Sequence, residues 1–326
     1  MEEKIYLPKD HKNKKEIAIS IIVVIIVTIA ILVIGSMIKK AKYHKTYEYK
    51  LLQLGYTKEE VKTLLDYENL DLDYVLTIEK NDKLIPILNE KYYLSKNLKK
   101  YIDYQKANTD KSTTDVIAII NTHNDDDYYT NEIASNQKKN LKILVNKHYH
   151  VDDKYEPDDL VKVSNWYSYG DDQFVRKEAY DEFVSMFNAA KEEDIKIIIN
   201  SSYRSYADQK ATYDDFIERY GLETTEALAA HPGNSEHQTG LAIDVTTPGY
   251  NTKTFDTSEA FTWLSNNAYK YGYIMRYPKD KEYLTGFDYE SWHYRYVGKD
   301  VAKYIHENNI TYDEYYAYFE ENENEK

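Results

Sequence analysis

Two histidines and two acidic residues are the side chains of this sequence whose types and spacing could perform chemistry together. His237 and Asp244 lie on either side of Gly240 in the stretch 234–245. If residues 241–245 form a strand, the apolar side chains point to one face and Asp244 to the other. Because Gly240 permits a sharp turn, His237 can fold back toward Asp244. One imidazole and one carboxylate make half of a zinc site.

A second stretch, residues 289–296, can supply the rest of such a site. His293 would be the third ligand, and Glu290 precedes it in the same stretch. Three protein ligands leave a fourth position for water, which is typical of a catalytic zinc. Zinc lowers the pKa of that water toward about 7, and a nearby carboxylate can take its proton and pass it to a leaving amine. We therefore expect one Zn²⁺ per chain, with Glu290 as base and acid.

Further polar residues complete this interpretation. Arg204 could stabilise the negative charge that develops on the carbonyl oxygen of a hydrolysed amide. Ser235, Gln209 and Tyr203 are candidate substrate-binding residues. Taken singly, each residue also fits a hydrogen-bonded structural role, and histidine and aspartate suit cobalt or nickel as well as zinc. The combination is what favours a hydrolytic metal site.

The combined motifs resemble those of the zinc D-alanyl-D-alanine carboxypeptidases of the VanY and DD/LD-carboxypeptidase type. The likeness extends over about residues 116–318. It is carried by Ser235-x-His237-x-x-Gly240-x-Ala242-x-Asp244, by Glu290-x-Trp292-His293, by Ser202-Tyr203-Arg204-Ser205 with Gln209, and by Arg276-Tyr277-Pro278 and Thr285-Gly286. Ser202 and Ser291 depart from the glycine and proline that are frequent in the family, which puts the fine backbone geometry in doubt.

The resemblance implies a fold, a site and an activity. The fold would be α+β of the hedgehog/DD-peptidase kind, with an antiparallel sheet flanked by helices. His237, Asp244 and His293 would bind the zinc, Glu290 would be the catalytic base, and Arg204 would stabilise the transition state. The activity would be removal of the terminal D-alanine from peptidoglycan stem peptides. Three alternatives stay open: L,D-carboxypeptidase or endopeptidase activity on the same peptides, a zinc-containing module that binds the wall without cutting, and a structural wall protein acting through its helical region.

Composition narrows the class of partner. The chain has 326 residues and a formal net charge of −14, which argues against nucleic acid because phosphate binding needs a basic surface. It contains no cysteine, so that disulfides and thiolate sites are excluded.

An uncharged stretch at residues 17–38 predicts a transmembrane anchor. As a helix it would span about 33 Å, which matches a bilayer core of about 30 Å. The run is longer than the apolar region of a signal peptide, so we expect an uncleaved single-pass anchor in contact with membrane lipid. Lysines flank both ends, and the positive-inside rule is close to a tie. A peptidoglycan substrate would place the N-terminus in the cytoplasm and the catalytic domain outside the cell.

The remaining pattern predicts the elements that position the site. We expect a cytoplasmic tail at 1–16, the anchor at 17–38, a helical stalk or small helical module at 39–110 with a capping box at Thr57, the catalytic domain at 111–319 and an acidic tail at 320–326. Within the domain the predicted strands are 116–120, 141–145, 195–199, 241–245, 272–276 and 292–297. The predicted helices are 174–191, 207–220 and 258–270, the last opened by Asp256, and a final helix capped by Thr311. Such mixing without regular βαβ repetition indicates α+β.

Overall fold

The computed structural model describes residues 14–170 and 172–321. The chain divides into two compact units, residues 1–89 and residues 90–326. Of the two predicted tails, residues 1–13 and 322–326 lie outside the described residues.

Helices are the only regular elements among the described residues of the first unit. Helix α1 (Lys14–Gln53) includes the stretch Ile19–Lys39, whose mean hydropathy of 3.2 and length of 21 residues are sufficient to cross a membrane. The other helices are α2 (Lys58–Asp66), α3 (Leu72–Val75) and α4 (Leu84–Leu88). The predicted capping box is confirmed, because the Thr57 hydroxyl accepts from the Glu60 amide and the Glu60 carboxylate accepts from the Thr57 amide.

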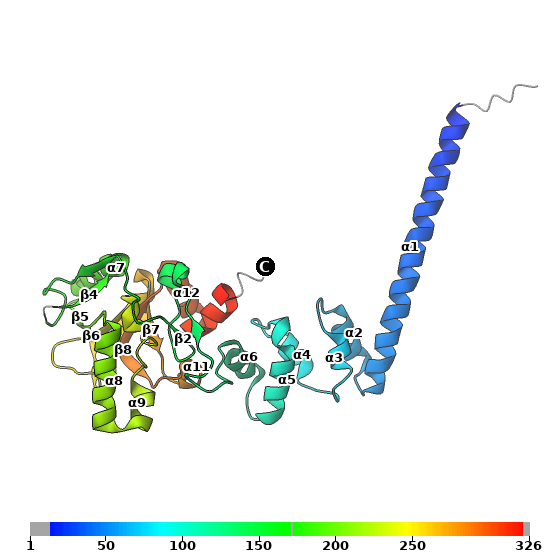
Figure 1. The fold of residues 1–326 in the computed structure, drawn as a ribbon. Helices are drawn as coiled ribbons and strands as arrows, with labels where there is room; N and C mark the ends of the chain where they lie inside the picture. The colour runs from blue at the N-terminus through cyan, green and yellow to red at the C-terminus, as the bar shows by residue number, and fades with distance from the viewer. Residues whose placement is uncertain (1–13, 171, 322–326) are drawn as a thin grey trace, which may run out of the picture. The chain divides into compact units, whose positions relative to one another are not determined.

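The second unit combines many helices with short strands (Figure 1). Its helices are α5 (Leu98–Ala107), α6 (Thr113–Asn121), α7 (Lys177–Glu192), α8 (Tyr206–Tyr220), α9 (Leu222–Leu228), α10 (Glu259–Asn267), α11 (Glu282–Thr285), α12 (Lys299–Asn308) and α13 (Tyr312–Tyr315). Its strands are β1 (Ile133–Ala134), β2 (Tyr149–His150), β3 (Leu160–Lys162), β4 (Phe174–Arg176), β5 (Ile198–Ser201), β6 (Ala242–Thr246), β7 (Tyr273–Tyr277) and β8 (Glu290–Tyr296).

A four-stranded sheet with the order β5-β6-β8-β7 organises this unit. Every neighbouring pair in it is antiparallel. The predicted fold class, α+β with an antiparallel sheet and flanking helices, is confirmed. The strands predicted at 241–245, 272–276 and 292–297 are confirmed within one or two residues as β6, β7 and β8, and helix 207–220 is confirmed as α8.

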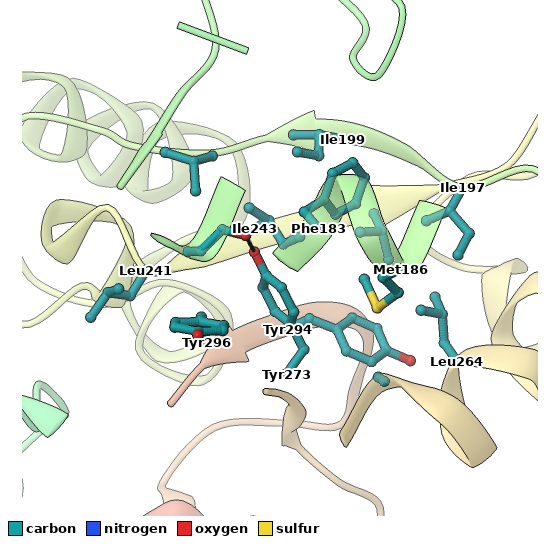
Figure 2. Packing of buried hydrophobic residues seen from close by; sticks show 14 of the residues in the cluster. Phe183, Met186, Ile197, Ile199, Leu241, Ile243, Leu264, Tyr273, Tyr294 and Tyr296 are labelled. Atoms are coloured by element: carbon teal, nitrogen blue, oxygen red, sulfur yellow. Dashed lines mark hydrogen bonds between the residues drawn. The ribbon is translucent and has the colours of Figure 1, made fainter. Parts of the chain in front are cut away.

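One face of this sheet packs against α7 and α10 to form the main hydrophobic core (Figure 2). Leu241, directly before β6, and Ile243 and Val245 within it are all buried in this cluster, as the period of two requires. From α7, Phe183 and Met186 are both fully buried against them. The core therefore occupies one face of β6 and leaves Asp244 on the other.

Two predicted strands are wrong. Residues 116–120 lie in helix α6, which Ser112 caps by accepting a hydrogen bond from the Asp115 amide. All five residues from Val116 to Ile120 are buried, so this part of α6 is apolar on every side and lacks the polar face that marks most helices. Residues 141–145 form the end of a 3-10 turn (Gln137–Lys142) followed by buried irregular backbone.

Two predicted helix starts also need correction. Residues 174–176 form strand β4, which pairs with β3, so that α7 begins only at Lys177. The helix expected from residue 258 is capped by Ser258, whose hydroxyl accepts from the Phe261 amide, and Asp256 lies in the preceding 3-10 turn.

Candidate active site

Two adjacent strands bring the first pair of site residues together. Asp244 of β6 and His293 of β8 are direct partners in the antiparallel ladder, which places their side chains on the same face of the sheet. Asp244 Oδ1 lies 3.1 Å from His293 Nδ1. The pair lies on the opposite face of β6 from Ile243 and the core.

A tight turn before β6 brings His237 to this pair. His237 belongs to a 3-10 turn, Glu236–Thr239, which ends at Gly240 in the left-handed region with φ of +66°. A Cβ atom at Gly240 would lie 2.7 Å from Leu160 Cδ2, so both the conformation and the close packing require glycine. The turn leaves His237 Nε2 3.5 Å from Asp244 Oδ2, as the sequence predicts.

The donor set formed by His237, Asp244 and His293 fits a metal ion. One ligand atom from each residue lies within 4.8 Å of the other two. His237 Nδ1 lies 2.7 Å from the carbonyl oxygen of Ser202, which only accepts, so Nδ1 carries the proton and Nε2 presents a lone pair. Burial and the charge of Arg204 lower the pKa of His237 to about 4. Two acceptors therefore face each other at Asp244 and His237, and a cation between them would satisfy both.

The charge state of Asp244 supports the same conclusion. Burial alone would raise the pKa of this carboxyl, but His237 and His293 outweigh it through charge and hydrogen bonding and hold the pKa well below its usual range. Asp244 is thus an anion in a largely enclosed place, with its side chain 16% exposed, and anions withdrawn from water are paired or bind metals.

Glu290 joins the cluster through an irregularity in the sheet. The ladder between β7 and β8 pairs Met275 with Tyr294 but Tyr277 with Glu290, so that β8 contains extra residues between the two pairs. Such bulges reorient side chains next to active sites. Glu290 Oε2 lies 3.6 Å from His293 Nδ1. Burial, reinforced by the negative charge of Asp244, raises the pKa of Glu290 to about 8.

One cavity of about 500 Å³ unites most of the predicted site residues. Its lining includes the predicted metal ligands and acid–base residue together with three other candidates, namely His237, Asp244, His293, Glu290, Arg204, Ser235 and Gln209. Tyr203 is not among the lining residues. It is half-buried, and its amide donates to the Phe174 carbonyl.

Two residues that line this cavity each have a buried polar atom without a hydrogen-bond partner in the described part of the chain. Within residues 14–170 and 172–321, neither Arg204 Nε nor Gln209 Oε1 has a hydrogen-bond partner, although both atoms are buried. The Gln209 amide nitrogen donates to the Ala230 carbonyl, 2.8 Å away, which fixes the orientation of the group. Buried polar groups are normally satisfied, so these two atoms are exceptions in the wall of the cavity.

Some residues at the site were not among the predicted candidates. An apolar wall of the cavity comes from Phe216 and Tyr220 on α8 and Leu228 on α9, and on the sequence these residues show only helical spacing. Glu236 also lines the cavity and is 1% exposed. In the sequence, the only indication that Glu236 belongs to the site is its position between Ser235 and His237, inside the motif.

A set of metal-ligand donors beside a carboxylate is the arrangement that metallohydrolases use, and the residues of this site fit it. The family model for VanY, D-alanyl-D-alanine carboxypeptidase, matches residues 172–299. YodJ of Bacillus subtilis is 43% identical over 187 residues, which cover 55% of this chain and 67% of YodJ. A D-alanyl-D-alanine carboxypeptidase of Enterococcus faecium is 34% identical over 187 residues, covering 55% of this chain and 58% of that protein.

A solved structure of a carboxypeptidase is also similar to this chain. The LdcB LD-carboxypeptidase, a structure that reveals the molecular basis of peptidoglycan recognition, shares 40% identity and a TM-score of 0.55, over 58% of this chain and 91% of that one. The chain belongs to the VanY family. The chain spans about 58% to 67% of the length of the two curated relatives above.

Proposed function

We propose that this protein is a membrane-anchored zinc carboxypeptidase that removes the C-terminal D-alanine from peptidoglycan stem peptides. The observation that carries the proposal is the convergence of His237, Asp244 and His293 beside Glu290 in one cavity. Membership of a family described as D-alanyl-D-alanine carboxypeptidases supports the choice of substrate.

His237, Asp244 and His293 would hold one Zn²⁺ per chain. When bound, this ion would supply Lewis acidity toward the scissile carbonyl and toward water. The protein contributes an oriented donor set, because Asp244 and His293 lie on paired strands and His237 is held by a backbone carbonyl.

Glu290 would carry the proton of the reaction. Its carboxyl group lies beside the proposed metal ligands, inside the cavity, where in its ionised form it can accept a proton at Oε2 and return it to the nitrogen of the leaving D-alanine. General acid–base catalysis of this kind contributes about 10²–10⁴-fold to a rate.

Arg204 and Gln209 would bind and orient the peptide. The free Nε of Arg204 can donate to the carbonyl oxygen as negative charge develops on it. The free Oε1 of Gln209 can accept from a peptide amide. Ser235 lies in the cavity as a further donor or acceptor. Tyr203 would act from the neighbouring segment, as part of the loop that orients Arg204.

The stretch Ile19–Lys39 would anchor the enzyme in the cell membrane through contact with lipid. We propose a single-pass topology with the N-terminus in the cytoplasm and the catalytic unit outside the cell. This orientation follows from the location of peptidoglycan, which lies outside the membrane.

L,D-carboxypeptidase activity is a second candidate function. It is favoured by the 40% identity to LdcB, an LD-carboxypeptidase with a TM-score of 0.55. The two activities differ in the peptide that they shorten: a D,D-enzyme converts pentapeptide to tetrapeptide, and an L,D-enzyme converts tetrapeptide to tripeptide.

Mass spectrometry of defined tri-, tetra- and pentapeptides digested with the zinc-loaded protein tests both candidates. We expect release of one D-alanine from the pentapeptide. Shortening of the tetrapeptide alone would establish the L,D-activity. Release of internal fragments only would contradict a carboxypeptidase, and intact peptides in the presence of bound zinc would favour a binding module.

A further inference from the structure

We propose that Glu236 is a positioning residue that directs Nδ1 of His293 toward the metal by holding the proton of this imidazole on Nε2. The inference rests on the proposed zinc site and extends it to a residue that is not itself a ligand. The ring of His293 has a carboxylate at each nitrogen: Asp244 Oδ1 lies 3.1 Å from Nδ1, and Glu236 Oε2 lies 3.4 Å from Nε2.

The two carboxylates have different roles because only one can share a metal with His237. Asp244 Oδ2 lies 3.5 Å from His237 Nε2, and these two residues form the donor set with His293. Glu236 contacts the opposite edge of the His293 ring. A carboxylate only accepts hydrogen bonds, so Nε2 donates to Glu236. With a metal ion between Nδ1 and Asp244, the ring proton would stay on Nε2 and Nδ1 would offer its lone pair to the metal. Carboxylate–histidine pairs of this kind orient metal ligands in proteins.

Glu236 is itself held in one orientation. Its Oε1 accepts from Arg276 Nε at 2.8 Å and from Arg295 Nη1 at 2.9 Å. All three side chains are buried. Because Oε1 is occupied by both guanidinium groups, Oε2 is the oxygen left to face His293.

The two arginines are fixed by separate partners. Arg295 Nη2 donates to the carbonyl oxygens of Leu141 and Ile143 at 3.1 and 2.7 Å. Arg276 forms a two-point ion pair with Asp313 of α13, with distances of 2.6 and 2.9 Å. The network therefore extends from the metal site to a helix beyond the residues 172–299 that match the family model.

The substitution Glu236→Gln tests whether Glu236 directs the His293 proton or serves only as a partner of Arg276 and Arg295. The amide oxygen would continue to accept from Arg276 and Arg295, so the amide NH₂ would face His293 Nε2. This nitrogen would then have to accept, and the ring proton would move to Nδ1, the atom needed by the metal. The arginines keep their other partners, so we expect the variant to fold.

The test measures zinc affinity of the full chain in detergent by competition with a chromophoric chelator. We expect Glu236→Gln to bind zinc about 10–100-fold more weakly than the wild type. Glu226→Gln is the matched control, because Glu226 Oε1 also contacts a histidine, His231, at 2.7 Å, and neither residue lines the cavity. We expect this control to bind zinc like the wild type. A cooperative unfolding transition of each metal-free protein shows that the variant is folded.

A folded Glu236→Gln variant with wild-type zinc affinity would overturn the proposal. If that variant does not fold, the zinc-loaded wild type labelled with ¹⁵N-histidine decides by NMR, with His293→Gln used to assign the resonances. A proton on His293 Nε2 and metal at Nδ1 supports the role of Glu236, and metal at Nε2 contradicts it. Failure of the wild type to bind zinc would instead contradict the proposed function, and so the two failures are distinguishable.

Discussion

Asp244 and His293 are cross-strand partners, with 3.1 Å between a carboxylate oxygen and a ring nitrogen. The proposed metal site is thus part of the sheet itself, because a shift of the β6–β8 ladder by one residue would turn one of the two side chains into the core. His237 reaches the pair from a turn and Glu290 through a bulge.

Asp244→Asn should abolish tight zinc binding. The change removes the anion that faces both imidazoles, so we expect a larger loss of affinity than the roughly 10–100-fold typical of an outer partner. Chelator competition measures it. Asp181→Asn, which alters an exposed i,i+4 pair on α7, is the control and should leave zinc affinity unchanged. Equal affinities of the two variants would exclude Asp244 as a ligand.

Glu290→Ala should separate catalysis from metal binding. We expect retained zinc and fold, and a turnover of stem peptide reduced by about 10²–10⁴-fold. Steady-state release of D-alanine measures the turnover, and metal analysis measures the zinc. Wild-type turnover in a zinc-loaded variant would show that another group moves the proton.

Arg204→Ala should lower kcat by about 10²–10³-fold while zinc remains bound, because one donor to the developing oxyanion is lost. Arg219→Ala removes an exposed arginine from α8 that pairs with Asp215, and should keep wild-type kinetics. If only KM rises in Arg204→Ala, the guanidinium binds the ground state and the transition state equally.

The lowered pKa of Lys147 predicts that the stability of the fold depends on pH. Burial lowers the pKa of this lysine to about 8, below the value of about 10.4 in an unfolded chain. Between these values the unfolded state binds more protons, so stability rises with pH. We expect the free energy of unfolding of the wild type, relative to Lys147→Met, to increase from pH 8 toward pH 10.

Urea titrations followed by tryptophan fluorescence report on the second unit, since Trp166, Trp263 and Trp292 all belong to it. A difference that is constant with pH would contradict the shifted pKa.

Gly240→Ala should destabilise the second unit by about 2–4 kcal/mol, because the left-handed conformation and the contact with Leu160 both oppose a Cβ atom. Gly249→Ala provides the control: its φ of +89° is also positive, but nothing lies within 4 Å of the added atom. The same urea titration compares them, and equal losses would show that the contact with Leu160 costs nothing.

The sequence predicted which side chains lie close together better than it predicted some of the elements around them. His237 and Asp244 lie in a turn and in the strand that directly follows it, and Glu290 and His293 lie in one strand, so short spacing brings each pair together. Residues 116–120 show the limit. A short run of β-branched residues reads as a buried strand, and periodicity cannot distinguish it from a helix buried on all sides.

Contacts between residues far apart in the sequence explain the other differences between the predicted and the observed structure. Residues 174–176 continue the helical pattern of α7, but they pair with β3, and pairing with a distant strand leaves no local signal. The contact of Glu236 with Arg276 and Arg295 is equally non-local. The motif contained Glu236, and only the fold shows what it touches.

The ion pair between Arg276 and Asp313 has a consequence for biogenesis. A ribosome adds residues from the N-terminus onward, so the proposed ligands His237, Asp244 and His293 are all synthesised before Asp313. A nascent chain therefore contains these residues while Arg276 still lacks this counter-ion. The buried ion-pair network beside the proposed site is complete only when residue 313 has been added.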